Sequence, residues 1–227
     1  MKNKLEVTQL KEFLKVTMPD EVLDKIKLLC QEIPKVEWSG VLFYSIVGSI
    51  KEPENMEIIL NDILPMDKGT SAFTSYDIDD RLIDYYTEKP EAMDLKMGHI
   101  HSHNTMGVFF SGTDMDELTE NADSHNFYFS LIVNNFMDFT AKVGFIATSE
   151  SKTVNVPSYA LDENGEKYEV ESNDVKIESK KCFTYDCDIE SSIEDITVTE
   201  YIEVYDAQYT TASAQTDSSI GDGTELN

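Results

Sequence analysis

The spacing of apolar residues along the chain alternates between two periods, and this alternation predicts where helices and strands lie. Apolar residues that recur every three or four positions indicate amphipathic helices, whereas runs rich in β-branched and aromatic residues indicate strands. On this basis helices are predicted over residues 19–33, 77–87 and 112–124. Strands are predicted over residues 37–47, 56–64, 96–102, 127–133 and 139–147. Helices and strands interleave up to residue 148, which predicts an α/β or α+β fold with a central sheet.

Turn residues support this division of the chain. Pro19 stands where the first helix begins, and Pro90 stops the second helix. The segment Pro53-Glu54-Asn55 joins the first two strands as a hairpin, and Asn134-Asn135 joins the last two. Residues 1–18 carry few signals apart from a short amphipathic segment around Leu10, Phe13 and Leu14.

The domain organisation follows from these elements and from a change of composition near residue 150. The main domain is predicted over residues 1–150, with its core at about 19–148. A further hairpin is predicted within residues 151–180, with its turn at Glu163-Asn164-Gly165. No basic residue follows Lys181, so residues 181–227 are predicted to form an acidic, largely disordered tail.

Length and charge narrow the classes of function. A chain of 227 residues with 41% hydrophobic content is long enough for one α/β domain with a sizeable core. The 44 acidic and 18 basic residues give a net charge of -26, and Arg81 is the single arginine. Such a surface opposes binding to phosphate backbones and to anionic membranes. We therefore expect no nucleic-acid partner and no membrane attachment, and we attribute the charge mainly to solubility.

The cysteines and the N-terminus indicate a cellular compartment. Cys30, Cys182 and Cys187 are an odd number, and no apolar signal core follows Met1. These features predict a reducing, cytoplasmic location. Cys182 and Cys187 are interpreted as incidental thiols, because no second Cys/His pair lies nearby to complete a tetrahedral metal site.

The strand over residues 96–102 leads into a cluster of histidines. Side chains alternate along a strand, so His99, His101 and His103 project to one face. His99 and His103 are about 13 Å apart along an extended chain, at about 3.3 Å per residue, so all three cannot bind one ion. Either His99 with His101 or His101 with His103 can converge on one metal.

A third ligand is expected from the helix that follows. Asp114 lies in the first turn of that helix and is the best candidate, because a catalytic zinc needs three protein ligands and an open position. A second interpretation is that Ser111-Gly112-Thr113-Asp114 is only a capping box, with Ser111 as the N-cap. Its place after an alternating histidine pair favours the metal site.

The spacing of His101-x-His103, Ser111 and Asp114 resembles the JAMM motif of the MPN+ zinc metalloproteases, and it is similar to the bacterial and phage branch of that family. The resemblance covers about residues 19–148 and implies an MPN/JAB-like, cytidine-deaminase-like core of three layers, with a central mixed β-sheet flanked by helices. It implies that His101, His103 and Asp114 bind Zn2+, that Glu37 activates the metal-bound water, and that Ser111 stabilises the oxyanion.

The resemblance also sorts the remaining residues of the cluster. It selects His101 and His103 over His99, which is expected to lie behind the ligands or to face the core. His125, near the end of its helix, is interpreted as a helix-terminal residue. Asn104 departs from the pattern, because many members carry proline after the second histidine. This departure leaves the ligands intact and weakens assignment to the eukaryotic deubiquitinase branch.

The expected function is zinc-dependent hydrolysis of a peptide or isopeptide bond in a protein or peptide substrate. Ubiquitin-like conjugates and viral or bacterial structural precursors are the two candidate substrates. A non-catalytic MPN scaffold is the main alternative, although such scaffolds usually lack a ligand that this chain retains. A third hypothesis keeps the zinc and changes the bond, as in a small-molecule amide or cysteine-adduct hydrolase.

Overall fold

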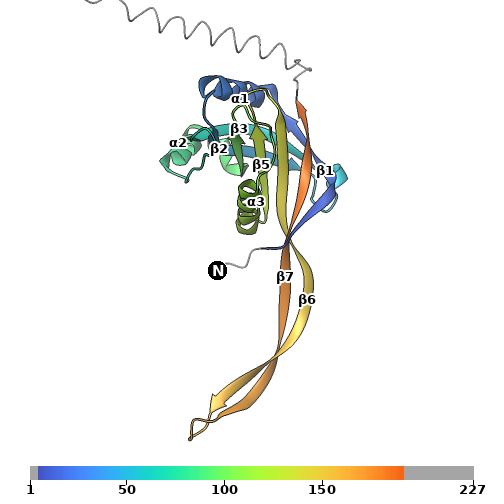
Figure 1. The fold of residues 1–227 in the computed structure, drawn as a ribbon. Helices are drawn as coiled ribbons and strands as arrows, with labels where there is room; N and C mark the ends of the chain where they lie inside the picture. The colour runs from blue at the N-terminus through green and yellow to red at the C-terminus, as the bar shows by residue number, and fades with distance from the viewer. Residues whose placement is uncertain (1–4, 192–227) are drawn as a thin grey trace, which may run out of the picture.

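The structure is a computed structural model that describes residues 5–191 (Figure 1). The helices and strands that were predicted between residues 19 and 148 are present in the predicted order. The helices are α1 (Asp20–Glu32), α2 (Asp80–Glu88) and α3 (Gly112–His125), with short 3-10 turns at Pro53–Asn55 and Pro90–Asp94. The strands are β1 (Val7–Met18), β2 (Trp38–Val47), β3 (Glu57–Lys68), β4 (Lys96–Ser102), β5 (Phe127–Val133), β6 (Phe139–Leu161) and β7 (Lys167–Ser191).

The strands form one mixed sheet in the order β1-β3-β2-β4-β5-β6-β7. The pairs β1–β3, β1–β7 and β4–β5 are parallel, and the other pairs are antiparallel. The predicted α/β class with a mixed central sheet is therefore confirmed. The sequence did not predict that β7 pairs with β1, which closes the sheet into a barrel.

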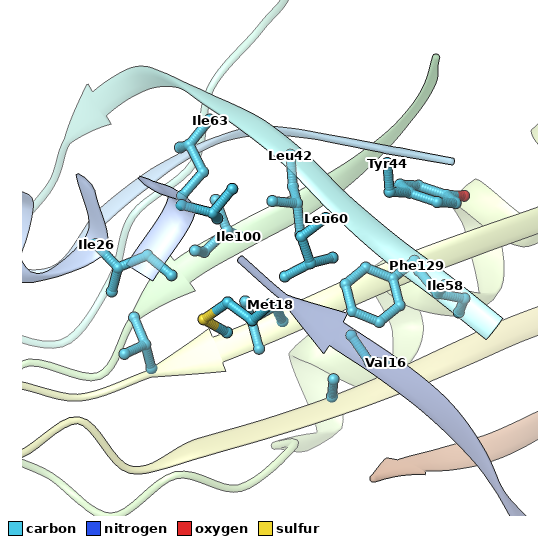
Figure 2. Close-up of a cluster of buried hydrophobic side chains, with 14 of the residues drawn as sticks. Val16, Met18, Ile26, Leu42, Tyr44, Ile58, Leu60, Ile63, Ile100 and Phe129 are labelled. Carbon is cyan, nitrogen blue, oxygen red and sulfur yellow. The ribbon is translucent and has the colours of Figure 1, made fainter. Parts of the chain in front are cut away.

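The main hydrophobic core lies inside this curved sheet. All of its strands contribute buried side chains, and α1 adds Val22, Leu23 and Ile26. Figure 2 shows Ile26 of α1 close to strand residues that include Ile63 and Ile100. These side chains are almost completely shielded from solvent, so their burial supplies much of the driving force for folding.

The other two helices pack against the opposite face of the sheet. Side chains alternate along β2, so Phe43 faces outward while Leu42 faces the main core. Phe43 stacks on Tyr85 of α2 with ring centroids 4.5 Å apart. In the same way, Leu118 of α3 packs with the outward-facing Tyr128 of β5. Helix α3, which was expected to carry the third metal ligand, is thereby held against β5.

The first strand corrects the expectation for the N-terminal segment. Residues 7–18 form a strand, and the amphipathic segment expected around Leu10 is its first half. Leu14, Val16 and Met18 are buried in alternation, which is the pattern of a strand with one face in the core. The core therefore begins well before residue 19, the predicted boundary.

The C-terminal part also differs from the prediction. The strand expected at residues 139–147 and the first strand of the added hairpin are one continuous strand, β6. Residues 181–191 were predicted to belong to a disordered tail, but they form the end of β7, where Cys182 and Thr184 are fully buried. The remainder of the predicted tail, residues 192–227, lies outside the described residues. The distal part of the two strands projects from the body as a long arm (Figure 1).

Two further features of residues 5–191 concern membrane-spanning helices and the state of the cysteines. No helix in this range has both the length and the apolar character that a membrane crossing requires. Cys30, Cys182 and Cys187 are all free thiols, with Cys30 and Cys182 buried and Cys187 half-buried.

Candidate metal centre

The histidine strand β4 lies in the middle of the sheet, between β2 and β5. Its register pairs His101 with Ser39 of β2 and with Ile132 of β5. His103 follows the end of the strand, and its backbone N–H donates to the carbonyl oxygen of Val133 over 2.7 Å. Neighbours on both sides thus position the histidine backbone before any ligand binds.

The three predicted ligands come together at the end of β4. The Nε2 atoms of His101 and His103 are 3.2 Å apart. Asp114 approaches them with Oδ1 at 3.4 Å from His101 Nε2 and Oδ2 at 4.0 Å from His103 Nε2. A tetrahedral zinc with bonds of about 2.0–2.1 Å has ligand atoms about 3.3 Å apart. The donor set and its spacing therefore fit a zinc ion.

Asp114 is held in place by the start of α3. Ser111 is the N-cap, and its Oγ accepts a hydrogen bond from the Asp114 backbone N–H over 3.3 Å. The Oδ2 atom of Asp114 in turn accepts from the Ser111 backbone N–H over 2.7 Å. Asp114 therefore belongs to both the capping box and the candidate metal site, which the sequence offered as alternatives.

The Nε2 atoms of His101 and His103 are both available to a metal, but a different feature of the structure accounts for each. The Nδ1 of His103 lies 3.0 Å from the carbonyl oxygen of Gly107, so Nδ1 carries the proton and donates to that oxygen. The Nε2 lone pair of His103 is then free for a metal, which is the usual second-sphere arrangement for a ligating histidine. Burial and then the neighbouring His99 lower the pKa of His101, which keeps that ring in the neutral, metal-binding form.

Glu37 reaches the same site through the register of β2 and β4. Because β2 and β4 are antiparallel and Ser39 pairs with His101, continuing the register by two residues sets Glu37 opposite His103. Its backbone is tied to the loop after β3 by hydrogen bonds with Thr70 and Gly69. Glu37 is only 5% exposed, and burial raises the pKa of its carboxyl, with His103 lowering the pKa and Asp114 raising it.

The candidate ligands open into a cleft of about 770 Å3. Glu37 and Ser111 line it together with the three ligands, so all five predicted site residues face one space. The Oγ of Ser111 accepts from Asp114, which leaves its own proton free to donate. Beyond Ser111, Met106 and Phe109 form an exposed apolar part of the lining, and Phe109 packs edge-on against His103.

His99 has a separate partner that the sequence did not indicate. It belongs to no three-ligand group in the described part of the chain, where His101, His103 and Asp114 form the single such group. Its Nδ1 contacts a carboxylate oxygen of Glu117, which projects from α3. The signal that could have found Glu117 is its spacing, since it lies three residues after Asp114 on one face of a helix. His125 is exposed and stacks on Tyr128, which fits a helix-terminal residue.

Asn104, the departure from the family pattern, has a structural role. Its backbone adopts a left-handed conformation with φ of 54°, which proline cannot adopt because its ring fixes φ near -65°. The carbonyl oxygen of Asn104 accepts from the Asn135 backbone N–H over 2.7 Å, and its side-chain oxygen accepts from the Asn135 amide over 3.1 Å. Asparagine therefore ties the turn after His103 to the turn after β5.

Comparisons with known proteins add little to this geometry. No family model matches the chain, and no curated protein matches it. Among solved structures, the solution structure of protein DSY2949 from Desulfitobacterium hafniense is similar to this chain with a TM-score of 0.40 and 13% sequence identity. That match covers 80% of this chain and 97% of the other.

Proposed function

We propose that this protein is a zinc-dependent hydrolase of the JAMM type that cleaves peptide or isopeptide bonds in protein or peptide substrates. The observation that supports the proposal is the convergence of His101 Nε2, His103 Nε2 and the Asp114 carboxylate at separations suited to one zinc ion. The two histidines are buried and Asp114 is half-buried, and a buried carboxylate, Glu37, lines the same cleft. Preformed ligands beside a candidate base are what hydrolysis requires.

Each site residue has a role in this reaction. A zinc ion held by His101, His103 and Asp114 would act as a Lewis acid that activates water and polarises the scissile carbonyl. Glu37 takes the proton from the attacking water and later delivers it to the leaving amine. Its raised pKa suits this exchange, because a base with a pKa closer to neutral can both accept and return a proton. Ser111 donates its free hydroxyl proton to the oxyanion.

We also propose that the domain is a variant of the MPN/JAB-like fold. The order of helix, hairpin, helix, histidine strand and helix supports this assignment. So does the position of the motif, with its histidines on β4 and its aspartate in the first turn of α3. The three free thiols support a reducing compartment such as the cytoplasm.

The first test of the proposal is metal content. Protein purified without chelator should contain about one zinc per chain, and the His101→Ala and Asp114→Ala variants should lose it. His125→Ala is the matched control, because it removes a histidine outside the ligand set and should retain the metal. Zinc-free wild-type protein that also fails to bind added zinc would refute the proposal and favour a non-catalytic scaffold.

The second test is hydrolysis itself. Protein termini and isopeptide conjugates in cells are compared between wild-type protein and the Asp114→Ala variant by mass spectrometry. New termini, or lost conjugates, that depend on Asp114 would identify the substrate and the bond. A zinc-loaded Glu37→Gln variant that processes the same substrates as fast as the wild type would contradict the role of Glu37.

A further inference from the structure

The arm formed by residues 150–179 of β6 and β7 has two unlike faces. Residues that pair across the two strands share a face, and successive residues along a strand alternate between faces. One face, which we call the apolar face, carries Val154 paired with Val175, Ala160 paired with Tyr168, and Val156. Asn173 and the pair Ser158–Glu171 interrupt it. The opposite face has a charged residue in four of its five pairs, which are Thr153–Lys176, Asn155–Asp174, Pro157–Ser172, Tyr159–Glu169 and Leu161–Lys167.

The apolar face is uncovered in a single copy of the protein. Val156, Tyr168 and Val175 are 44%, 52% and 44% exposed. The arm projects away from the body (Figure 1), and within residues 5–191 its strands pair only with each other. On the opposite face, by contrast, the Nζ of Lys167 lies 3.9 Å from the centre of the Tyr159 ring. A two-stranded ribbon alone is marginally stable in water, and a sheet with one apolar face usually packs on that face.

Charge is distributed unequally along the arm. At its base, residues 148–152 and 176–181 contain four lysines and two acidic residues. At its tip, residues 161–167 contain three acidic residues, Asp162, Glu163 and Glu166, and one lysine. The base is therefore positive and the tip negative. Two such arms attract each other when they lie antiparallel, because each base then meets the other copy's tip.

We propose that two copies of this protein associate through the apolar faces of their arms, which stack antiparallel about a twofold axis. Such an interface uses the same surface of both copies, so the arm must be complementary to itself. The charges of its base and tip and the apolar residues between them meet that requirement. The proposal is independent of the proposed hydrolase, because it involves none of the residues of the candidate metal centre.

A single register matches both the charges and the apolar residues. A twofold axis level with Pro157 sets each residue of β6 opposite the residue equally far beyond Pro157 in the second copy. Lys152 then lies opposite Asp162 at the tip, and Val154 lies opposite Ala160.

The residues of β7 follow the same register. Val175 pairs with Val154, and Tyr168 pairs with Ala160, so Val175 of one arm lies opposite Tyr168 of the other. The two apolar pairs of each arm thus meet those of the second copy. Because two-stranded ribbons twist strongly, the stacked arms would coil around each other.

The antiparallel arrangement also keeps the two acidic bodies apart. The chain has a net charge of -26, so two copies repel each other over most of their surfaces. From Lys152 to Asp162 the arms overlap over about 33 Å, at about 3.3 Å per residue. That length is several times the Debye length of about 8 Å at physiological ionic strength. A parallel arrangement would instead bring the bodies, and the acidic tips, together.

The size of the interface predicts a weak dimer. Two strands about 4.8 Å apart that overlap over about 33 Å cover about 300–400 Å2 of each copy. This area is smaller than the total of about 1,200–2,000 Å2 that stable complexes bury. We therefore expect a dissociation constant of roughly 1–100 µM.

The first test measures the association of the full chain by sedimentation velocity from about 1 to 300 µM, a range that spans the expected constant. Val154→Ser with Val175→Ser should weaken the dimer at least about tenfold. Tyr159→Ser with Leu161→Ser is the matched control, because it removes two apolar residues from the opposite face and should leave the dimer intact. A wild-type protein that stays monomeric throughout, or a dimer that both double variants affect equally, would overturn the proposal.

The second test reverses charge at the two ends of the arm. Lys152→Glu with Lys180→Glu makes the base acidic, and Glu163→Lys with Glu166→Lys makes the tip basic. Each double variant alone should associate at least about tenfold more weakly than wild type, because its base and tip then carry like charges.

An equimolar mixture of the two charge variants should restore the dimer. In the mixed pair the reversed base of one copy meets the reversed tip of the other, and the two unchanged ends meet as well. A loss of folding in either variant could not produce this recovery, and circular dichroism checks that both are folded. A mixture that associates as weakly as the separate variants would overturn the antiparallel arrangement.

Discussion

Ser111 and Asp114 each donate a backbone N–H to the other's side-chain oxygen, at 2.7 and 3.3 Å respectively, at the start of α3. This reciprocal pair fixes the carboxylate whose other oxygen faces His101. The ligand is therefore oriented by the helix cap before a metal binds, and less conformational entropy is lost on binding. Helix stability and metal affinity therefore both depend on Ser111 and Asp114, and the two effects must be measured separately in each variant.

Replacing Ser111 tests this coupling. Ser111→Ala removes the oxygen that accepts from Asp114 and should lower the free energy of unfolding of the zinc-free protein by about 1 kcal/mol, as measured in urea. Ser111→Thr keeps a capping hydroxyl and is the control, with a smaller loss. Zinc affinity measured by competition with a chelator should fall in the same order. Unchanged stability in Ser111→Ala would show that the cap does not support the helix.

Glu37→Gln separates catalysis from metal binding. The side chain is not one of the three converging ligands, so the variant should retain zinc at the wild-type ratio. Glutamine has nearly the same size but accepts no proton, so cleavage of a substrate found in cells should slow by about 10²- to 10⁴-fold. Asp114→Ala serves as the comparison that loses both zinc and cleavage. Loss of zinc from Glu37→Gln would mean that Glu37 is a ligand.

Gly98 allows β4 and β5 to approach closely beside the histidines. A Cβ built on Gly98 would lie 2.4 Å from the carbonyl oxygen of Phe129, so the strands would have to separate. Gly98→Ala should therefore cost about 1–3 kcal/mol of stability and weaken zinc binding through the displaced histidines. Gly112→Ala is the matched control, because a Cβ there meets nothing within 4 Å and should stabilise α3 by about 0.4–1 kcal/mol. Urea denaturation of both variants checks the contrast.

Local patterns predicted most of the fold, and the failures share one cause. The segment around Leu14 and Val16 has a strand's alternation, but its partners β3 and β7 lie far away in the sequence. Residues 181–191 were assigned to the tail because they are acidic, although Cys182 and Thr184 are fully buried. In both cases the strand is stabilised by pairing across the closure of the sheet. Composition and local period contain no information about that pairing.

The same distinction holds for the candidate site. His101 and His103 share a face through strand alternation, and Ser111 and Asp114 meet through a helix cap, so both pairs follow from local spacing. The contact between His99 and Glu117 depends on how α3 is rotated against the sheet, which packing of its apolar face decides. The spacing of Glu117 from Asp114 agrees with this contact, but spacing alone did not single out Glu117 as the partner of His99.

The arm formed by the distal halves of β6 and β7 is expected to be dispensable for the body. From residue 150 to residue 179, every strand pairing in the described chain is between the two strands of the arm itself. Joining Thr148 directly to Lys180 through an Asn-Gly turn suits their paired positions. The shortened protein should keep its zinc content and thermal midpoint within a few degrees. Unfolding or loss of zinc would show that the arm stabilises the site.

Asp62 connects three elements of the body through one carboxylate. Its oxygens accept from Lys25 of α1 over 2.7 Å, from Tyr85 of α2 over 2.7 Å and from Lys89 over 2.5 Å. Burial alone would raise the pKa of Asp62, but hydrogen bonds from Lys25, Lys89, Tyr85 and the Ile63 backbone outweigh it. The pKa is therefore held well below its usual range.

The depressed pKa of Asp62 predicts a stability that depends on pH. The carboxyl has an unfolded pKa of about 3.9, so its contribution is fully present above that value and is lost as the pH falls toward the lower folded pKa. Asp62→Asn should cost about 1.5–3 kcal/mol at about pH 7, and the difference from wild type should shrink at about pH 3. Asp24→Asn, which removes an exposed partner of Lys27, should change stability by less than about 1 kcal/mol at either pH. A cost of Asp62→Asn that stayed constant between these pH values would contradict the prediction. It would show that the contacts of Asp62 do not favour its ionised form, and that packing alone joins α1, β3 and α2.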